Sequence, residues 1–160
     1  MSRKTLADEI QSENMAPEIA AFLNVIRTAD LFSIELQRFF KPHHVTLQQF
    51  NILRILRGGP EGGIPSLEIG SRMVSCAPDV TRLIDRMEKA GLVTRTRSDE
   101  DRRVVRIKIT EKGLDLAEQL LEPLTALHRE QLAALGSEEV GELSRLLELS
   151  RTRQSLIEAH

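Results

Sequence analysis

The segment from Pro78 to Ile109 restricts the possible folds more than any other part of the sequence. Pro78 suits the first turn of a helix, where no intrahelical N–H bond is needed, and Gly91 suits the left-handed residue at a helix end. Between them, "PDVTRLIDRMEKAG" predicts one amphipathic helix. The following stretches, "LVTRTR" and "RVVRIKI", are rich in β-branched residues and joined by a short polar segment, which is typical of a β-hairpin.

Two helices are predicted in the first 60 residues. From about Pro17 to Lys41, apolar residues recur every three or four positions, which is the period of an amphipathic helix, and Pro42 ends it. Thr46 and Gln49 have the spacing of a capping box, so we expect the next helix to begin there. The "GGP" sequence at residues 58–60 ends that helix.

Three further helices complete the predicted order. Ser66 is a suitable N-cap for a short helix that reaches about Met73. Thr110 caps a long helix with a leucine-rich face, and a last helix starts near Val140 after a break at Gly136-Ser137. The chain therefore consists of four helices, a hairpin and two helices.

This order predicts a mainly α fold of the α+β winged helix-turn-helix type, with about six helices and a two-stranded β-hairpin as the wing. We divide the chain into an N-terminal arm with a dimerisation helix (1–45), a winged helix-turn-helix lobe (46–110) and C-terminal dimerisation helices (111–160). The long helices from both termini carry apolar stripes that a small lobe cannot cover, so a homodimer is expected. Two-fold symmetry would place its two recognition helices about 34 Å apart, one turn of DNA.

Positive charge is concentrated in one part of the chain. The whole chain has a net charge of −2, yet residues 66–108 hold 10 Lys/Arg and 7 Asp/Glu, a net charge of +3. The remainder holds 12 Lys/Arg and 17 Asp/Glu, a net charge of −5. Because charges farther away than about 10 Å are screened at 0.1 M salt, the local excess can attract phosphates. Double-stranded DNA is therefore the expected partner.

The predicted helix before the hairpin has an apolar side and a charged side. At helical spacing, the apolar residues are Val80, Leu83, Ile84 and Met87, and the charged residues are Arg82, Asp85, Arg86 and Lys89. One interpretation is an ordinary solvated face on which Asp85 and Lys89 pair. The preceding helix and turn favour the other interpretation, a recognition helix in the major groove of DNA. The candidate DNA-contacting residues are Pro78, Asp79, Thr81, Arg82 and Arg86, and Asp79 is expected to orient Arg82.

The polar tip of the hairpin combines basic and acidic residues. An arginine that enters the minor groove needs a fixed direction, and a neighbouring carboxylate can hold it by a bidentate pair. Asp101 is the candidate anchor for Arg103, with Arg102 between them. The alternative interpretation is an ordinary charged loop.

The stretch "LIDRMEKAGLVTRTRSDEDRRVVRIKITEKG" (83–113) resembles the MarR family of prokaryotic transcription regulators. The resemblance rests on D-R-x-E-x-x-G-L-V, the D-x-R wing tip and the T-x-x-G start of the next helix. It implies an obligate homodimer, formed by the first and the last two helices, that binds a pseudo-palindromic operator and is expected to act as a repressor. By position, Arg103 corresponds to the minor-groove arginine of the wing, and residues 78–86 to the groove-reading segment.

The resemblance also implies regulation by a small ligand or by cysteine oxidation. Phe39, Phe40, His43 and His44 lie where a ligand cleft is expected, although a solvated histidine pair is the simpler interpretation. Cys76 lies in the turn before the recognition helix, where an oxidised adduct would obstruct DNA docking; its alternative role is a small buried turn residue.

Several functional classes are not indicated by the sequence. We find no Gly-rich phosphate loop, GxSxG or HExxH, so neither an enzyme nor a cofactor is expected. The four His and one Cys lack metal-ligand spacing, and no apolar run approaches the roughly 18 residues of a membrane span. The single cysteine indicates a cytoplasmic protein. The remaining alternative is a winged-helix module that binds protein, or a dimeric scaffold without sequence-specific DNA binding.

Overall fold

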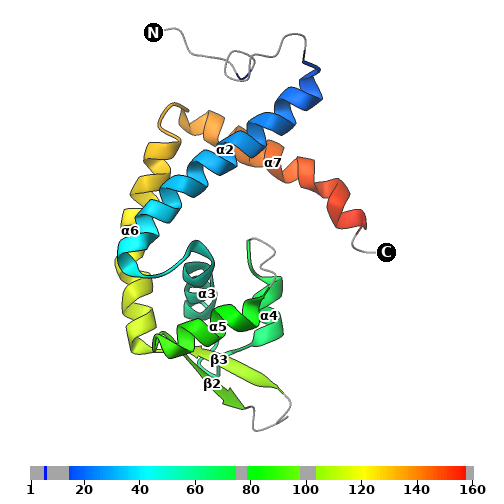
Figure 1. Ribbon diagram of the computed structural model, residues 1–160. Helices are drawn as coiled ribbons and strands as arrows, with labels where there is room; N and C mark the ends of the chain where they lie inside the picture. Colours follow the sequence, from blue (N-terminus) through cyan, green and yellow to red (C-terminus); the bar gives the residue numbers. More distant parts are fainter. Residues whose placement is uncertain (1–5, 7–14, 75–78, 98–103, 158–160) are drawn as a thin grey trace. The chain divides into compact units, whose positions relative to one another are not determined.

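The helices and strands follow one another in the predicted order, with one additional strand (Figure 1). The computed structural model describes residues 6, 15–74, 79–97 and 104–157. The chain forms two units, Met1–Glu118 and Gln119–His160. The elements are α2 (Pro17–Phe40), η1 (Lys41–His43), α3 (Leu47–Arg57), β1 (Ile64–Pro65), α4 (Ser66–Ser71), α5 (Val80–Lys89), β2 (Val93–Arg97), β3 (Val105–Ile109), α6 (Glu111–Gln131) and α7 (Ser137–Ile157). The predicted mainly α winged helix-turn-helix fold is confirmed.

The capping box at the start of α3 is present as predicted. The Gln49 backbone N–H donates to Thr46 Oγ1 over 3.2 Å, and the Thr46 backbone N–H donates to Gln49 Oε1 over 2.9 Å. These bonds satisfy two N–H groups that a helix start otherwise leaves without partners. They fix where α3 begins, and thereby which of its residues face the core.

A third strand extends the predicted hairpin to a small antiparallel sheet in the order β1-β3-β2. β2 and β3 pair from Val93 opposite Ile109 to Arg97 opposite Val105, and β1 places Ile64 opposite Ile107. The sequence predicts no strand between the helix end at residues 58–60 and Ser66, so β1 is a correction. A strand of two residues has no detectable alternation, and Pro65 lowers β propensity, although an edge position tolerates it.

The predicted bounds of two helices were wrong by a few residues. α4 begins at Ser66 itself with Pro65 as its N-cap, and no side chain caps it; it ends at Ser71, before Met73. α7 begins at Ser137 rather than near Val140, because the carboxylate of Glu139 accepts the Gly136 N–H over 2.7 Å and supports an earlier start. These shifts leave the predicted order of elements unchanged.

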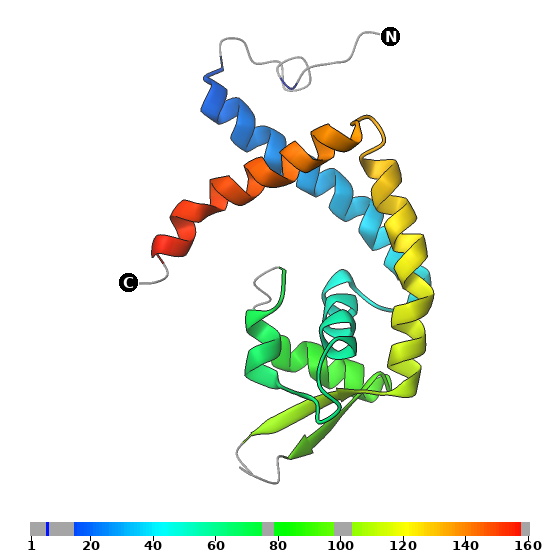
Figure 2. The same ribbon diagram turned by 180° about the vertical axis from the view of Figure 1, so that it is seen from behind.

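The core of the first unit lies between α3, α4, α5 and the sheet. Its fully buried apolar side chains include Phe50, Ile52, Leu53, Ile64, Ile69, Ile84, Met87, Val93 and Ile107. From the end of α2, the ring of Phe40 packs against that of Phe50 with centroids 5.2 Å apart. Burial of each large side chain stabilises the fold by about 1.5–3 kcal/mol. Figures 1 and 2 show the hairpin of β2 and β3 projecting beyond these helices.

The end of α5 is joined to the start of α6 by polar bonds and close packing. Gly91 adopts the predicted left-handed conformation, with φ 72°. The Thr110 hydroxyl donates to the Gly91 carbonyl over 2.7 Å, and Lys112 Nζ donates to the Ala90 carbonyl over 2.8 Å. Gly113 lies so close to the Leu92 carbonyl that no side chain fits there. The junction therefore holds α5 and the first turn of α6 together.

The second unit comprises the end of α6 and all of α7. On α7 the carboxylate of Glu142 accepts two hydrogen bonds of 2.8 Å from the Arg145 guanidinium, which lower the pKa of Glu142. The apolar side chains of Leu143, Leu146 and Leu149 are exposed on the same helix. No helix in the described part of the chain combines the length and apolarity that a membrane crossing requires.

We predict that Gly113→Ala lowers the free energy of unfolding by about 1–3 kcal/mol. The added Cβ would lie 2.2 Å from the Leu92 carbonyl oxygen and 3.0 Å from Ile109 Cγ1, so the junction must shift. Gly141→Ala is the matched control, because nothing lies within 4 Å of a Cβ at that position. That change should stabilise α7 by about 0.5–1 kcal/mol. Urea denaturation measures both, and an unchanged stability of Gly113→Ala would contradict the packing argument.

Candidate nucleic-acid interface

Helix α5 is fixed at its first turn by Asp79, which is the N-cap. Asp79 Oδ1 accepts the backbone N–H of Arg82 over 2.9 Å. Its other carboxylate oxygen, Oδ2, lies 2.9 Å from Arg82 Nε. The expected Asp79–Arg82 pair is therefore present, and its role in orienting Arg82 for DNA stays a prediction. The cap itself was not predicted, because Pro78 suggests a helix start two residues before Val80.

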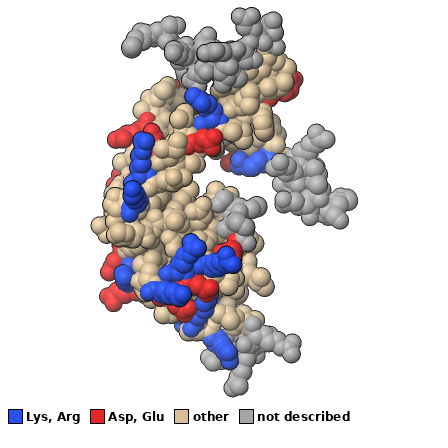
Figure 3. All heavy atoms as spheres, in the orientation of Figure 1, with Lys and Arg blue, Asp and Glu red and all other residues tan. Residues whose placement is uncertain are grey.

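The predicted division of α5 into apolar and charged faces is confirmed. Ile84 and Met87 are fully buried against the core. On the outer side, 78% of the Arg82 side chain is exposed, and Thr81 and Arg86 are also exposed. Figure 3 shows Lys and Arg side chains gathered on this part of the molecule, with Asp and Glu side chains among them. The apolar face thus sets the direction in which the cations point.

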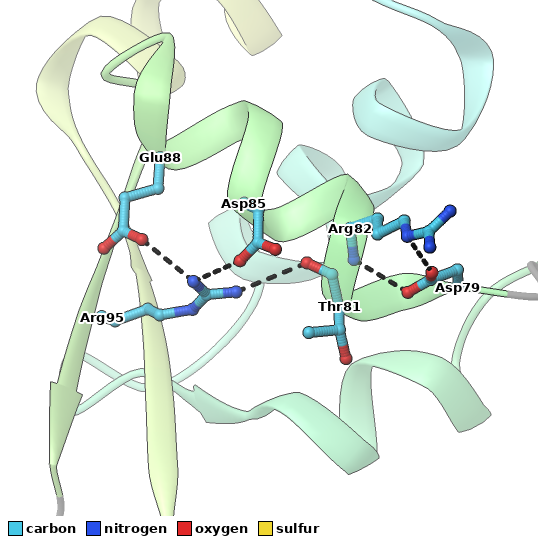
Figure 4. Close-up of polar contacts among 6 residues, drawn as sticks. All are labelled: Asp79, Thr81, Arg82, Asp85, Glu88 and Arg95. Carbon is cyan, nitrogen blue, oxygen red and sulfur yellow. Dashed lines mark hydrogen bonds and ion pairs between the residues drawn. The ribbon is translucent and has the colours of Figure 1, made fainter.

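Arg95 on β2 makes contacts with α5 that the sequence did not predict. Its Nη1 lies 2.5 Å from Asp85 Oδ1 and 3.1 Å from Glu88 Oε2. Its Nη2 donates to the Thr81 carbonyl over 3.4 Å. Figure 4 shows the guanidinium lying between these three acceptors, while the Arg82–Asp79 pair occupies the start of the helix. Asp85 therefore pairs with Arg95, and not with Lys89 as in the simpler interpretation of this face.

Several predicted site residues lie outside the described part of the chain. They are Pro78 before α5, the candidate redox residue Cys76, and the wing-tip residues Asp101, Arg102 and Arg103. Their proposed roles stay predictions. The described strands β2 and β3 precede and follow the wing tip in the sequence. Their last pair before it is Arg97 opposite Val105.

The four residues predicted to line a ligand cleft lie at the end of α2 and in η1. Phe40 is a core residue, packed edge-on against Phe39 with ring centroids 5.0 Å apart. Phe39 and His43 are half-buried, with ring centroids 5.9 Å apart. His44 is exposed and left-handed, with φ 55°. Three of the four side chains thus remain accessible, although Phe40 serves the fold.

A groove of about 530 Å³ lies beside these residues on the first unit. The end of α2 and the start of α3 supply its lining: Ser33, Leu36, Gln37, Phe40, Lys41, Val45, Thr46, Leu47 and Gln48. Phe40 is the member of the predicted cleft that lines it. Within the described residues, no group of three His, Cys, Asp or Glu side chains is placed to hold a metal ion.

Comparisons with known proteins converge on one family. A sequence model described as the MarR family matches residues 45–105. The HTH-type transcriptional regulator PecS of Dickeya dadantii is 31% identical over 123 residues, covering 76% of this chain and 74% of PecS. A crystal structure of a MarR transcription factor from Planctomyces limnophilus is 41% identical, covers 86% of this chain and 99% of its own, and has a TM-score of 0.65. The crystal structure of a mutant MarR from E. coli complexed with operator DNA is 25% identical and has a TM-score of 0.73. The match covers 92% of this chain and 99% of that chain.

We predict that Asp79→Ala and Asp79→Asn differ in stability. Alanine removes both the cap and the ion pair, so the free energy of unfolding should fall by about 1 kcal/mol. Asparagine keeps a cap acceptor and loses only an exposed ion pair, which should cost about 0.5 kcal/mol or less. Urea denaturation of both variants measures the difference. Equal losses would mean that the cap does not stabilise α5.

Proposed function

Because the chain belongs to the MarR family of winged-helix transcriptional regulators, we propose that it represses transcription as a homodimer bound to a pseudo-palindromic operator. The observation that carries the proposal is the exposed basic side of α5, which is held in a helix-turn-helix frame by the buried side of the same helix. A regulator that binds chromosomal DNA acts in the cytoplasm, and we assign the chain to that compartment.

The chemistry of α5 suits a DNA groove. A guanidinium can donate two parallel hydrogen bonds to a guanine edge or to a phosphate, so Arg82 and Arg86 are the proposed readers. The Thr81 hydroxyl can donate, accept or contact a thymine methyl group. Asp79 limits the freedom of Arg82 before DNA arrives, because the ion pair holds its side chain. A module that binds only protein would have no evident use for this set of exposed cations.

Exposed apolar residues on the long helices support the homodimer. On α2, the side chains of Ile19, Phe22, Val25, Ile26, Leu31 and Ile34 are between 46% and 64% exposed. On α7, Leu143, Leu146 and Leu149 are between 38% and 60% exposed. Large exposed apolar patches on soluble proteins are typical of interfaces. A second copy of the chain would cover them, and two lobes are needed for a two-fold symmetric operator.

The groove between the end of α2 and the start of α3 supports the proposed control by a small ligand. Its volume of about 530 Å³ lies within the range of ligand pockets, about 300–1,000 Å³. Leu36, Phe40 and Val45 supply apolar walls, and Lys41 supplies a positive charge. The matching ligand is a small apolar molecule with one anionic group. Phe39, His43 and His44 do not line this groove.

We predict specific binding to duplex DNA from the promoter that the chain controls, with a steep dependence on salt. If the dimer contacts 6–10 phosphates, affinity should fall by about 10³–10⁵ between 50 and 200 mM salt, because bound counterions are released on association. Fluorescence anisotropy at several salt concentrations measures the slope, and sedimentation velocity measures the dimer. Binding that does not respond to salt would oppose the proposal, as would monomers at the concentrations used.

The wing arginine gives a second prediction. Arg103→Ala should weaken operator binding by about 1–3 kcal/mol without changing the fold or the dimer. If Asp101 anchors Arg103, Asp101→Asn should also weaken binding, and the double variant should lose less than the sum of the two. Wild-type affinity in Arg103→Ala would remove the wing from the interface, and additive losses would remove the anchoring role of Asp101.

A further inference from the structure

The acceptors of Arg95 and the cations of α5 form two separate stripes along the helix. At about 100° per residue, Thr81, Asp85 and Glu88 fall within about 60° of one another. Arg82, Arg86 and Lys89 are each one position later, so they form a parallel stripe displaced by about 100°. We call these the acceptor stripe and the basic stripe. The acceptor stripe lies between the buried side of α5 and the basic stripe.

Arg95 covers the acceptor stripe from the neighbouring strand. It contacts both carboxylates and the Thr81 carbonyl, as Figure 4 shows. Of the three charged side chains, that of Arg95 is the most buried, with 29% of it exposed. Asp85 and Glu88 are 44% and 40% exposed, so both carboxylates remain accessible to solvent and to other cations. The three charged groups sum to −1.

Asp85 has competing partners on its own helix. It stands four residues before Lys89 and three residues after Arg82, which are the spacings at which helical side chains pair. Yet neither Lys89 nor Arg86 has an ion-pair partner among the described residues. As long as Asp85 pairs with Arg95, its carboxylate does not neutralise a cation of the basic stripe. A carboxylate released from Arg95 would either neutralise one of these cations or face an approaching phosphate.

We propose that Arg95 is a positioning residue for DNA binding, which holds the carboxylates of Asp85 and Glu88 against β2 and so leaves the basic stripe available to DNA. The inference rests on the proposed DNA-binding function and adds a residue that does not itself need to touch DNA. The same contacts join α5 to the wing, because Arg95 belongs to the strand that leads into the wing tip.

Two other roles for Arg95 would give different results. If Arg95 only braced the fold, its loss would lower stability together with affinity, and removing an acidic partner would not help. If Arg95 contacted a phosphate directly, its loss would weaken binding whether or not Asp85 kept its charge. Sequestration of the carboxylates predicts instead that removing one of them compensates for the loss of Arg95.

The test compares operator binding of the wild type with Arg95→Met, Arg95→Lys and the double variant Arg95→Met/Asp85→Asn. Arg95→Met should bind about 10-fold more weakly, which corresponds to about 1.4 kcal/mol. Its log–log salt slope should be smaller by about 0.9 for each phosphate that the variant no longer neutralises. Arg95→Lys keeps the charge and should retain most of the affinity. The double variant carries the same net charge as the wild type and should recover to within about twofold of wild-type affinity.

The control for net charge is Arg95→Met/Glu130→Gln, since Glu130 is an exposed carboxylate on α6 that belongs to neither α5 nor the wing. This variant should stay as weak as Arg95→Met. Thermal unfolding of each variant separates a folding defect from a binding defect. Unchanged affinity of Arg95→Met, failure of Asp85→Asn to restore it, or equal recovery with Glu130→Gln would each overturn the inference while wild-type binding stands. A wild type that binds no operator would instead refute the proposed function, and the inference with it.

Discussion

The burial of Ile84 and Met87 fixes the rotation of α5 about its own axis, and every DNA contact proposed for this helix depends on that rotation. Each residue turns the helix by about 100°, so a core that accepted the next residue after each of these would turn Arg82 and Arg86 to where the acceptor stripe now lies. The position of α5 along its own axis is fixed by other contacts, at its two ends. Asp79 caps the first turn of α5, and the bonds from Thr110 and Lys112 close its last turn. A helix held at both ends and along one side presents its remaining side as a rigid surface.

The junction between α5 and α6 also restricts how these two helices can move relative to each other. The close approach of Gly113 to the Leu92 carbonyl means that the first turn of α6 cannot approach the end of α5 any further. The Lys112 bond to the Ala90 carbonyl also limits how far the two can separate. A displacement of this turn of α6 toward α5 would therefore displace the end of α5.

Local signals explain which features could be predicted from the sequence. The capping box at Thr46, the left-handed Gly91 and the two faces of α5 each follow from residues within about one or two helical turns of one another. The short strand β1 gave no such signal, because its pairing with β3 depends on residues more than forty positions away. The same limit applied to Arg95. Its partners lie on the preceding helix, and only the reversal of the chain at Gly91, which lays β2 beside α5, brings them together.

Three carboxylates, those of Asp79, Asp85 and Glu88, lie within the basic surface of α5, and each of them is in an ion pair. Asp79 both caps α5 and holds Arg82, so its charge supports a cation in place of opposing a phosphate. Asp85 and Glu88 are paired with Arg95 of β2, and on our proposal this pairing leaves Arg86 and Lys89 available to DNA. Pairing within the fold determines which charges are available, so the affinity for DNA should follow the arrangement of ion pairs more closely than the count of charged residues.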